Sequence, residues 1–195
     1  MSPIQKPRVS VFIATSLDGF IARQDGDVAW LHEGEPPPEG EDLGFGELMN
    51  AIDYLLMGRV TFEKVLEFGQ WPYEKPVMVL SRSLTEVPGH LQSRVSITSD
   101  SPEALMKRLD QAGVRHVYLD GGKVIQSFLG HGLVDDLCLT TLPILLGQGR
   151  PLFGALTADI HLKHRFTKAW DNGFVQSSYR VLHASKNQAL QTDGQ

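Results

Sequence analysis

Two glycine-containing turns stand where the sequence passes from a strand-like segment to a helix-like segment. Residues 57–63 (MGRVTFE) contain the first turn at Gly58, and residues 119–125 (LDGGKVI) contain the second at Gly121 and Gly122. Each turn offers backbone N–H groups at a helix N-terminus, where the helix dipole favours an anion, and glycine lets the backbone approach that anion closely. Either turn alone is more often plain turn chemistry, but the pair predicts a diphosphate held between two helix starts.

A third segment adds cationic side chains to this prediction. Ser81 and Arg82 follow the apolar run Pro76–Ser81, and Arg59 lies in the first glycine turn. The planar guanidinium fork of arginine donates two parallel hydrogen bonds to a phosphate. A ribose 2′-phosphate distinguishes NADPH from NADH, and arginine is its usual partner. Arg59, Ser81 and Arg82 therefore predict a second phosphate site.

The two most familiar nucleotide motifs do not occur in this sequence. Gly147-Gln148-Gly149 is followed by Leu152 where a G-x-G-x-x-G motif would place its third glycine, and no G-x-x-x-x-G-K-[ST] is found. The ordinary dinucleotide-binding fold and the P-loop fold are both disfavoured.

The elements that must position these turns alternate between strand and helix over the first two thirds of the chain. Predicted strands are Val9–Ala14, Ile52–Met57, Pro76–Ser81, Arg94–Thr98 and Arg115–Asp120, and predicted helices are Leu43–Ala51, one capped by Thr61 and ending near Phe68, one from Ser101 to near Gly113, and Lys123–Leu129. Such alternation predicts a mostly parallel sheet. Leu137–Thr141, Ile160–Ala169 and Gly173–Leu182 read as strands without helices between them, which predicts antiparallel additions at the C-terminal end.

Length and composition set broad limits on the class of protein. The 195 residues predict a single α/β domain over 1–195, with a core of about 8–182 and a polar C-terminal tail. A net charge of -5 argues against a general nucleic-acid binder, and no apolar run reaches the ~20 residues of a membrane helix. Cys138 is the only cysteine, which excludes an intrachain disulfide and any site built on several cysteines. We expect a cytoplasmic protein without a metal site.

Several other residues admit both a structural and a functional interpretation. Asp18, before Gly19, is more simply a turn former than a site residue. Asp27 is either a solvated loop residue or part of a substrate mouth shaped together with Trp30, and Trp30 is either a core anchor or a stacking surface for a planar ligand. His161 and His164 lie three residues apart in a predicted strand, which places the two rings on opposite faces and disfavours metal binding.

Taken together, these segments resemble the dihydrofolate reductases and, more closely, the reductase domain of riboflavin biosynthesis. The resemblance covers roughly residues 8–182 and is carried by residues 9–22, 57–63, 79–82 and 121–129 for the wider class, and by residues 14–19, 26–30, 132–137 and 143–153 for the riboflavin-type reductases. It implies a dihydrofolate-reductase-like, doubly wound α/β sheet that binds NADPH across its carboxyl edge.

The resemblance also implies roles for individual residues of this sequence. It assigns Gly58, Arg59 and Thr61 to the adenosine phosphates, Ser81 and Arg82 to the 2′-phosphate, Gly121, Gly122, Lys123 and Val124 to the diphosphate, Ala14 and Ile21 to the nicotinamide, and Leu146 and Gly147 to the opposite side of the pocket. Members of this family usually pair through their late strands, and Leu137–Leu146 is apolar for its length, so we expect a homodimer.

Two departures from the pattern bear on the reaction. Riboflavin-type reductases usually carry a basic residue after the first Asp-Gly, where this sequence has Phe20, which weakens a ribose-phosphate substrate. Dihydrofolate reductases place a carboxylate at a fixed spacing before M-G-R, and Asp42 stands at that spacing, so Asp42 is the expected catalytic proton donor or orienting carboxylate.

The sequence therefore predicts hydride transfer from NADPH to a small planar heterocycle, pteridine- or pyrimidine-like, or to a sugar-derived compound. The rival hypothesis is a nucleotide-binding or sensor protein of the same fold without turnover, which the basic residue missing at Phe20 favours. A structural or interaction domain without a ligand is a third reading.

Overall fold

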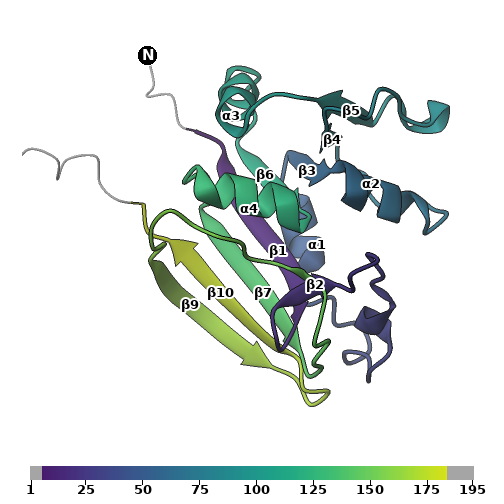
Figure 1. The fold of residues 1–195 in the computed structure, drawn as a ribbon, viewed down its shortest axis with the longest axis vertical. Coiled ribbons are helices and arrows are strands. Elements are labelled where there is room, and N and C mark those ends of the chain that lie inside the picture. Colours follow the sequence, from purple (N-terminus) through teal and green to yellow (C-terminus); the bar gives the residue numbers. More distant parts are fainter. Residues whose placement is uncertain (1–5, 184–195) are drawn as a thin grey trace, which may run out of the picture.

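The alternation of apolar strands and amphipathic helices expected from the sequence is present in the computed structural model, which describes residues 6–183 (Figure 1). The strands are β1 (Arg8–Ser16), β2 (Phe20–Ala22), β3 (Tyr54–Gly58), β4 (Val77–Leu80), β5 (Val95–Thr98), β6 (His116–Asp120), β7 (Asp136–Leu142), β8 (Arg150–Pro151), β9 (Leu162–Ala169) and β10 (Val175–Val181). The α-helices are α1 (Phe45–Ala51), α2 (Arg59–Leu66), α3 (Pro102–Gln111) and α4 (Gly122–Gly130), and the short 3-10 helices are η1 (Ala29–His32) and η2 (Gly89–Leu91).

Eight of these strands form one sheet in the order β5-β4-β3-β6-β1-β7-β10-β9. Neighbouring strands from β5 to β7 are parallel, whereas β10 is antiparallel to both β7 and β9. This confirms the predicted α/β fold with a mostly parallel sheet and antiparallel C-terminal strands. One detail differs, because β7 extends the parallel part, pairing with β1 from Ser10↔Asp136 to Ser16↔Leu142.

Helices cover both faces of the sheet, because the parallel strands are apolar on both sides. Leu56 and Val117 face the cluster formed with α3 and α4, whereas Leu55, Met57 and Tyr118 face the cluster formed with α1 and α2. In Figure 1, α4 lies across β1 and β6. Each fully buried apolar side chain of this kind stabilises the fold by roughly 1.5–3 kcal/mol.

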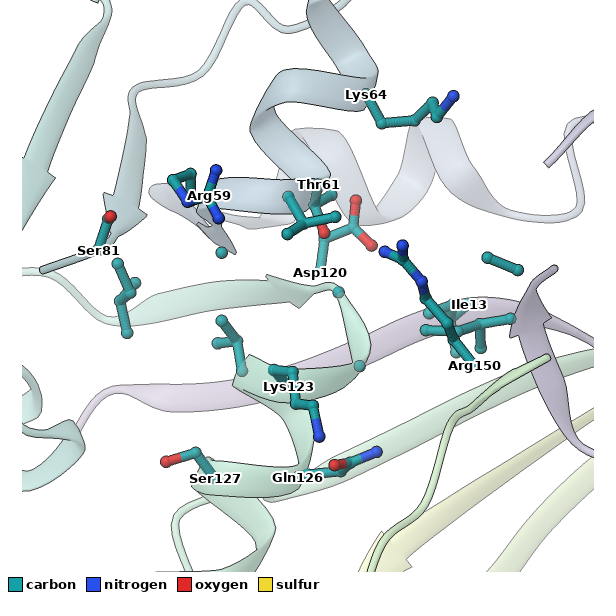
Figure 2. Close-up of a pocket in the computed structure, with 18 of the residues that line it drawn as sticks. Ile13, Arg59, Thr61, Lys64, Ser81, Asp120, Lys123, Gln126, Ser127 and Arg150 are labelled. Atoms are coloured by element: carbon teal, nitrogen blue, oxygen red, sulfur yellow. The ribbon is translucent and has the colours of Figure 1, made fainter. Parts of the chain in front are cut away.

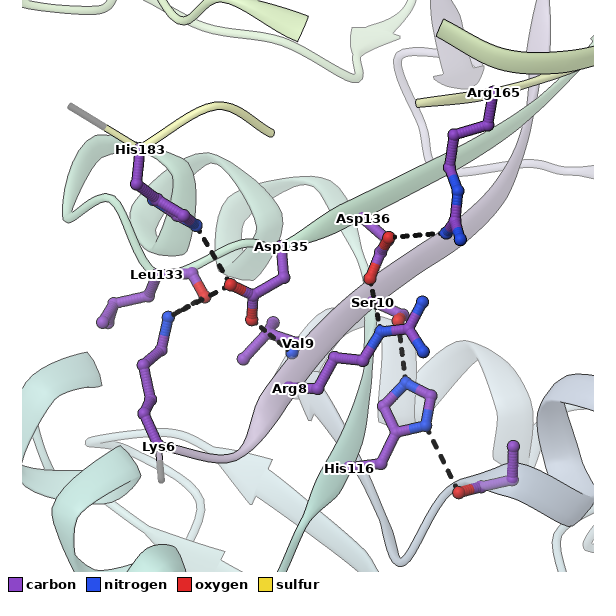
Figure 3. A network of polar contacts seen from close by, with 11 residues as sticks. Lys6, Arg8, Val9, Ser10, His116, Leu133, Asp135, Asp136, Arg165 and His183 are labelled. Atoms are coloured by element: carbon purple, nitrogen blue, oxygen red, sulfur yellow. Dashed lines mark hydrogen bonds and ion pairs between the residues drawn. The ribbon is translucent and has the colours of Figure 1, made fainter. Parts of the chain in front are cut away.

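An ion-pair network joins β1, β7 and β9 at the amino edge of the sheet (Figure 3). Asp136 accepts from Arg8 Nε at 2.5 Å and from Arg165 Nη1 at 2.9 Å. Beside it, Asp135 accepts from the backbone N–H of Val9 at 2.8 Å and pairs with His183. The network fixes the early strand against the late ones at the edge where β1 and β7 begin, opposite their carboxyl ends.

Three local expectations are confirmed or corrected by the structure. Ser101 caps α3 as predicted, because its hydroxyl accepts from Ala104 N at 3.3 Å with Pro102 in the first turn. Helix α2 begins at Arg59, so Thr61 lies inside its first turn and is not the cap.

Helix α1 begins at Phe45 instead of Leu43. The backbones of Leu43 and Gly44 are left-handed, with φ of 59° and 89°, and a left-handed residue cannot continue a right-handed helix.

Among residues 6–183, no helix has the length and apolar content needed to cross a membrane.

Candidate functional site

A cleft of about 1080 Å³ runs along the carboxyl edge of the sheet (Figure 2). The ends of β1, β3, β4, β5 and β6 line its floor, and the first turns of α2 and α4 lie along it. In open parallel sheets, ligands bind outside the carboxyl ends of the strands, so this position is the expected one. Every residue predicted to contact the cofactor lines this cleft: Ala14, Ile21, Gly58, Arg59, Thr61, Ser81, Arg82, Gly121, Gly122, Lys123 and Val124.

The two glycine turns lie against each other at the middle of the cleft. A Cβ atom added to Gly121 would overlap the hydroxyl of Thr61 and would lie 3.9 Å from the backbone nitrogen of Gly58. A Cβ added to Gly58 would lie 3.3 Å from Cγ2 of Val124. Gly121 has φ 91° and ψ 131°, a conformation that is essentially restricted to glycine. The close approach of two strand-to-helix turns therefore depends on glycine.

Neither helix start is closed by a side chain. The residue before α2 is Gly58 and the residue before α4 is Gly121, and neither helix has a side-chain capping hydrogen bond. The first N–H groups of a helix have no partner within the helix, so two sets of donors lie on adjoining walls of one cleft. With the dipoles of α2 and α4, they form a site suited to an anion.

One end of the cleft carries hydroxyl and guanidinium groups. The hydroxyl of Ser81 accepts from Leu84 N at 2.9 Å and from Ser83 N at 3.2 Å, which shapes the turn after β4. Arg59 is paired with Glu63 at 2.7 Å, whereas Arg82 forms no ion pair with any residue between 6 and 183. Residues 98–102, at the start of α3, complete this end.

Asp120 is a carboxyl group of the cleft to which the sequence interpretation gave no role of its own. It is the last residue of β6, and burial raises its pKa to about 6. It pairs with no cation among the described residues, and Figure 2 shows it beside Thr61. The sequence signal was available, since an acid ends a buried strand directly before Gly121.

The structure does not bring Asp42 into the cleft. Its Oδ1 accepts from Gly44 N at 2.8 Å, and its Oδ2 accepts from Gly46 N at 2.8 Å. Both oxygens are used to hold the start of α1, where a carboxylate also interacts favourably with the helix dipole.

The residues predicted for the substrate mouth also lie outside the cleft lining. Trp30 is 1% exposed and packs with Leu142 and Phe174, so it occupies the core-anchor role. Asp27 accepts from Ala29 N at 3.2 Å at the start of η1.

The backbones of Leu146 and Gly147 are hydrogen-bonded to the loop that follows β1. Their N–H groups donate to the carboxylate of Asp18, at 3.2 and 2.7 Å. Hydrogen bonds from Ser16 and from these amides hold the pKa of Asp18 below its usual value. Asp18 therefore does more than form its own turn, since it joins the loop after β1 to the loop after β7.

The other end of the cleft is mostly apolar. Its residues come from the end of β1, from β2 and the loop after it, from α2 and from β8: Ile13, Ala22, Gly26, Val28, Leu31, Lys64, Val65, Phe68 and Arg150. Strand β8, which supplies Arg150, is only two residues long and was not predicted from the sequence. No cluster of metal-ligating side chains is found within residues 6–183.

The sheet order, the glycine turns and the cleft at the carboxyl edge define a dihydrofolate-reductase-like α/β fold. The family model described as the RibD C-terminal domain matches residues 7–176. The chain therefore belongs to the RibD C-terminal domain family.

Similar proteins span nearly the whole chain. The Bacillus subtilis (strain 168) protein YwjB, itself uncharacterized, is 31% identical over 172 residues, which is 87% of this chain and 95% of YwjB. A solved structure from Shewanella sp. PV-4, provisionally assigned to riboflavin biosynthesis, is 40% identical with a TM-score of 0.86, and the match covers 90% of this chain and 99% of that one.

A more distant structure shares the fold alone. The Thermotoga maritima diaminohydroxyphosphoribosylaminopyrimidine deaminase/5-amino-6-(5-phosphoribosylamino)uracil reductase is 17% identical with a TM-score of 0.69. The match covers 91% of this chain and 57% of that bifunctional protein.

Proposed function

We propose that this protein is an NADPH-dependent reductase that transfers a hydride to a small heterocyclic or sugar-derived compound. The observation that carries the proposal is the contact between two uncapped, glycine-dependent helix starts, with Ser81 and Arg82 at one end of the same cleft. The family and its reductase relatives support the same conclusion.

The residues present fit this cofactor in shape and charge. A diphosphate lying in the cleft against both glycine turns would receive backbone N–H groups from both helix starts, and the missing Cβ atoms let the two turns lie close enough to share it. Arg82 has no carboxylate partner among the described residues, so its guanidinium group is available to a 2′-phosphate. The nicotinamide end would then lie toward Ala14 and Ile21.

The protein would position the cofactor and the substrate, exclude water from the reaction and supply a proton. When bound, NADPH supplies the hydride. The apolar wall of Ile13, Ile21 and Val28 excludes water from the reacting end of the cleft. Asp120, beside Thr61 at the glycine turns, is the carboxyl group of the cleft suited to hold a proton, because burial brings its pKa to about 6, close to working pH.

A nucleotide-binding or sensor protein without turnover is the second candidate. The observation that favours it is the commitment of Asp42 to the backbone of α1, which leaves the carboxylate expected for catalysis outside the cleft. This candidate keeps the cofactor site and differs only in the reaction.

Two measurements test the proposal and separate the candidates. NADPH and NADH are titrated by cofactor fluorescence into the wild type, Arg82→Ala and Arg94→Ala, the last an exposed arginine outside the cleft. We expect tight NADPH binding that weakens roughly 10- to 100-fold in Arg82→Ala alone. Absence of NADPH binding would refute both candidates.

Turnover then decides between the two. NADPH oxidation is followed over a panel of dihydropteridines, aminopyrimidines and small carbonyl compounds. Oxidation that depends on any of these compounds excludes the sensor, and binding without oxidation across the panel favours it.

A further inference from the structure

Arg150 is the arginine at the apolar end of the cleft. Three arginines line the cleft, and Arg59 and Arg82 both lie near β4 at the opposite end. Arg150 lies on β8, and Figure 2 shows its side chain reaching into the cleft from the side of Ile13. Unlike the exposed Arg59 and Arg82, it is half-buried.

The cations of this cleft differ in whether their charge is already compensated. Arg59 pairs with Glu63 at 2.7 Å, and Lys64 pairs with Glu67 at 2.6 Å. Arg150 has no carboxylate within 4.0 Å in the part of the chain that the structure describes, and only its Nε donates a hydrogen bond there. Its two terminal NH2 groups are therefore left for a ligand.

Contacts on three sides hold this guanidinium group in place. Its Nε donates to the carbonyl of Gln24 at 3.3 Å, and its backbone pairs with Ala22 of β2. The group lies over Gly26, where an added Cβ would be 3.1 Å from Arg150 Cζ. A side-chain hydrogen bond of 2.9 Å between Gln24 and Gln148 closes the same loop. A guanidinium group held in this way loses little conformational entropy when an anion binds.

The carboxylates of this loop are occupied by other groups. Asp25 Oδ1 accepts from Asp27 N at 2.9 Å, and Asp27 Oδ2 accepts from Ala29 N and lies 3.8 Å from Arg23 Nε. Arg23 also lies 3.6 Å from Glu33. The loop thus satisfies its own charges without Arg150. Figure 2 shows the Arg150 side chain directed toward Asp120, but the two form no ion pair within 4.0 Å among residues 6–183, and burial raises the pKa of Asp120 to about 6.

We propose that Arg150 anchors an oxyanion of the substrate, a carboxylate or a phosphate, at the end of the cleft opposite Arg82. The substrate class is therefore a planar compound that carries an anionic substituent and lies with its ring toward Ala14 and Ile21. This inference rests on the proposed function in one respect, since it treats the apolar end of the cleft as the substrate end.

A binding experiment tests the anion site without any reaction. The side-chain Nε–Hε signals of ¹⁵N-arginine-labelled protein are followed by NMR during titration with benzoate and, separately, phenyl phosphate, first alone and then with saturating NADPH. We expect a saturable shift of the Arg150 signal, assigned by its absence in Arg150→Ala, which persists when NADPH occupies the other end. A response confined to other arginines overturns the proposal, and the more effective probe identifies the preferred oxyanion.

A kinetic experiment tests the same residue on matched substrates. Pairs with the same ring, with and without the anionic group, are compared: dihydrofolate with dihydrobiopterin, and a ribosylaminouracil 5′-phosphate with its nucleoside. In Arg150→Ala, we expect kcat/KM for the anionic member of the accepted pair to fall roughly 10- to 100-fold, mainly through KM, with the neutral member unchanged. Arg150→Lys should retain part of the preference.

Gln148→Ala provides the matched control, because it loosens the same loop by removing the Gln24–Gln148 hydrogen bond and leaves the guanidinium group in place. An equal loss in Gln148→Ala, or an equal loss on both members of the pair, would show that Arg150 acts through the loop and would overturn the proposal. Absence of turnover on every pair contradicts the reductase function, and the NMR titration still decides the anion site.

Discussion

Substituting alanine for Gly121 tests the central geometry of the cleft. The added Cβ would overlap the hydroxyl of Thr61 in the first turn of α2, so Thr61 would have to move away from the turn at Gly121. In addition, φ 91° and ψ 131° are costly for any residue with a Cβ. We expect Gly121→Ala to weaken the paired anion site, because the clash and the strain would shift the two sets of N–H donors relative to each other.

The magnitude follows from these two effects. A backbone conformation of this type costs about 1–3 kcal/mol for a non-glycine residue, and inserting a methyl group into a packed contact costs about 1–3 kcal/mol. For a domain of this size, each kcal/mol lowers Tm by roughly 2–4 °C. Gly121→Ala should therefore lower Tm by several degrees and weaken NADPH binding by more than tenfold.

Gly113→Ala is the matched control, because Gly113 also has a positive φ, of 80°, but has no neighbouring atom within 4 Å of an added Cβ. It should lose stability from backbone strain alone and bind NADPH like the wild type. Both variants are compared by thermal denaturation with and without NADPH. Equal affinity for NADPH in Gly121→Ala and Gly113→Ala would refute the reasoning, since the two turns would then not share a ligand.

Three further predictions concern pH and assembly. Burial raises the pKa of Asp120 to about 6, so the free energy of unfolding should decrease as pH rises from about 4 through 6, by about 3 kcal/mol at most. Asp120→Asn should remove this pH dependence, which thermal melts across that range would measure. Lys168 and Trp170 lower the pKa of Glu41 to about 2, so its contribution to stability is complete above pH about 4.5 and is lost as pH falls toward 2. The difference in Tm between the wild type and Glu41→Gln should therefore be largest above pH 4.5 and disappear toward pH 2. We also propose a homodimer formed through the late strands, since β9 is exposed along its length and Phe166 is 48% exposed, and a monomer in light scattering at micromolar concentration would contradict this.

Much of the fold could be predicted because its signals are local. The runs that became β1, β3, β4 and β6 are apolar on both faces, and the Ser101-Pro102 start of α3 carries its own capping chemistry. The glycine turns were also visible, because each follows such a run directly. These signals are strong enough to place the glycine turns and the polar end of the cleft from the sequence.

The apolar end of the cleft could not be predicted in the same way, because non-local contacts decide it. Asp42 reads as a catalytic acid by its spacing, but the left-handed backbone of Leu43 and Gly44 turns its carboxylate onto α1. Trp30 becomes part of a core cluster through Leu142 and Phe174, which lie more than a hundred residues later. Arg150 reaches the cleft only because the two-residue β8 pairs with β2.

The most direct test of the account is a crystal structure of the protein grown with NADPH. We predict a dinucleotide extended along the carboxyl edge of the sheet, with its diphosphate against the turns at Gly58 and Gly121, its 2′-phosphate at Arg82 and its nicotinamide against Ala14. A dinucleotide bound elsewhere, or one whose diphosphate contacts only one of the two helix starts, would contradict the account.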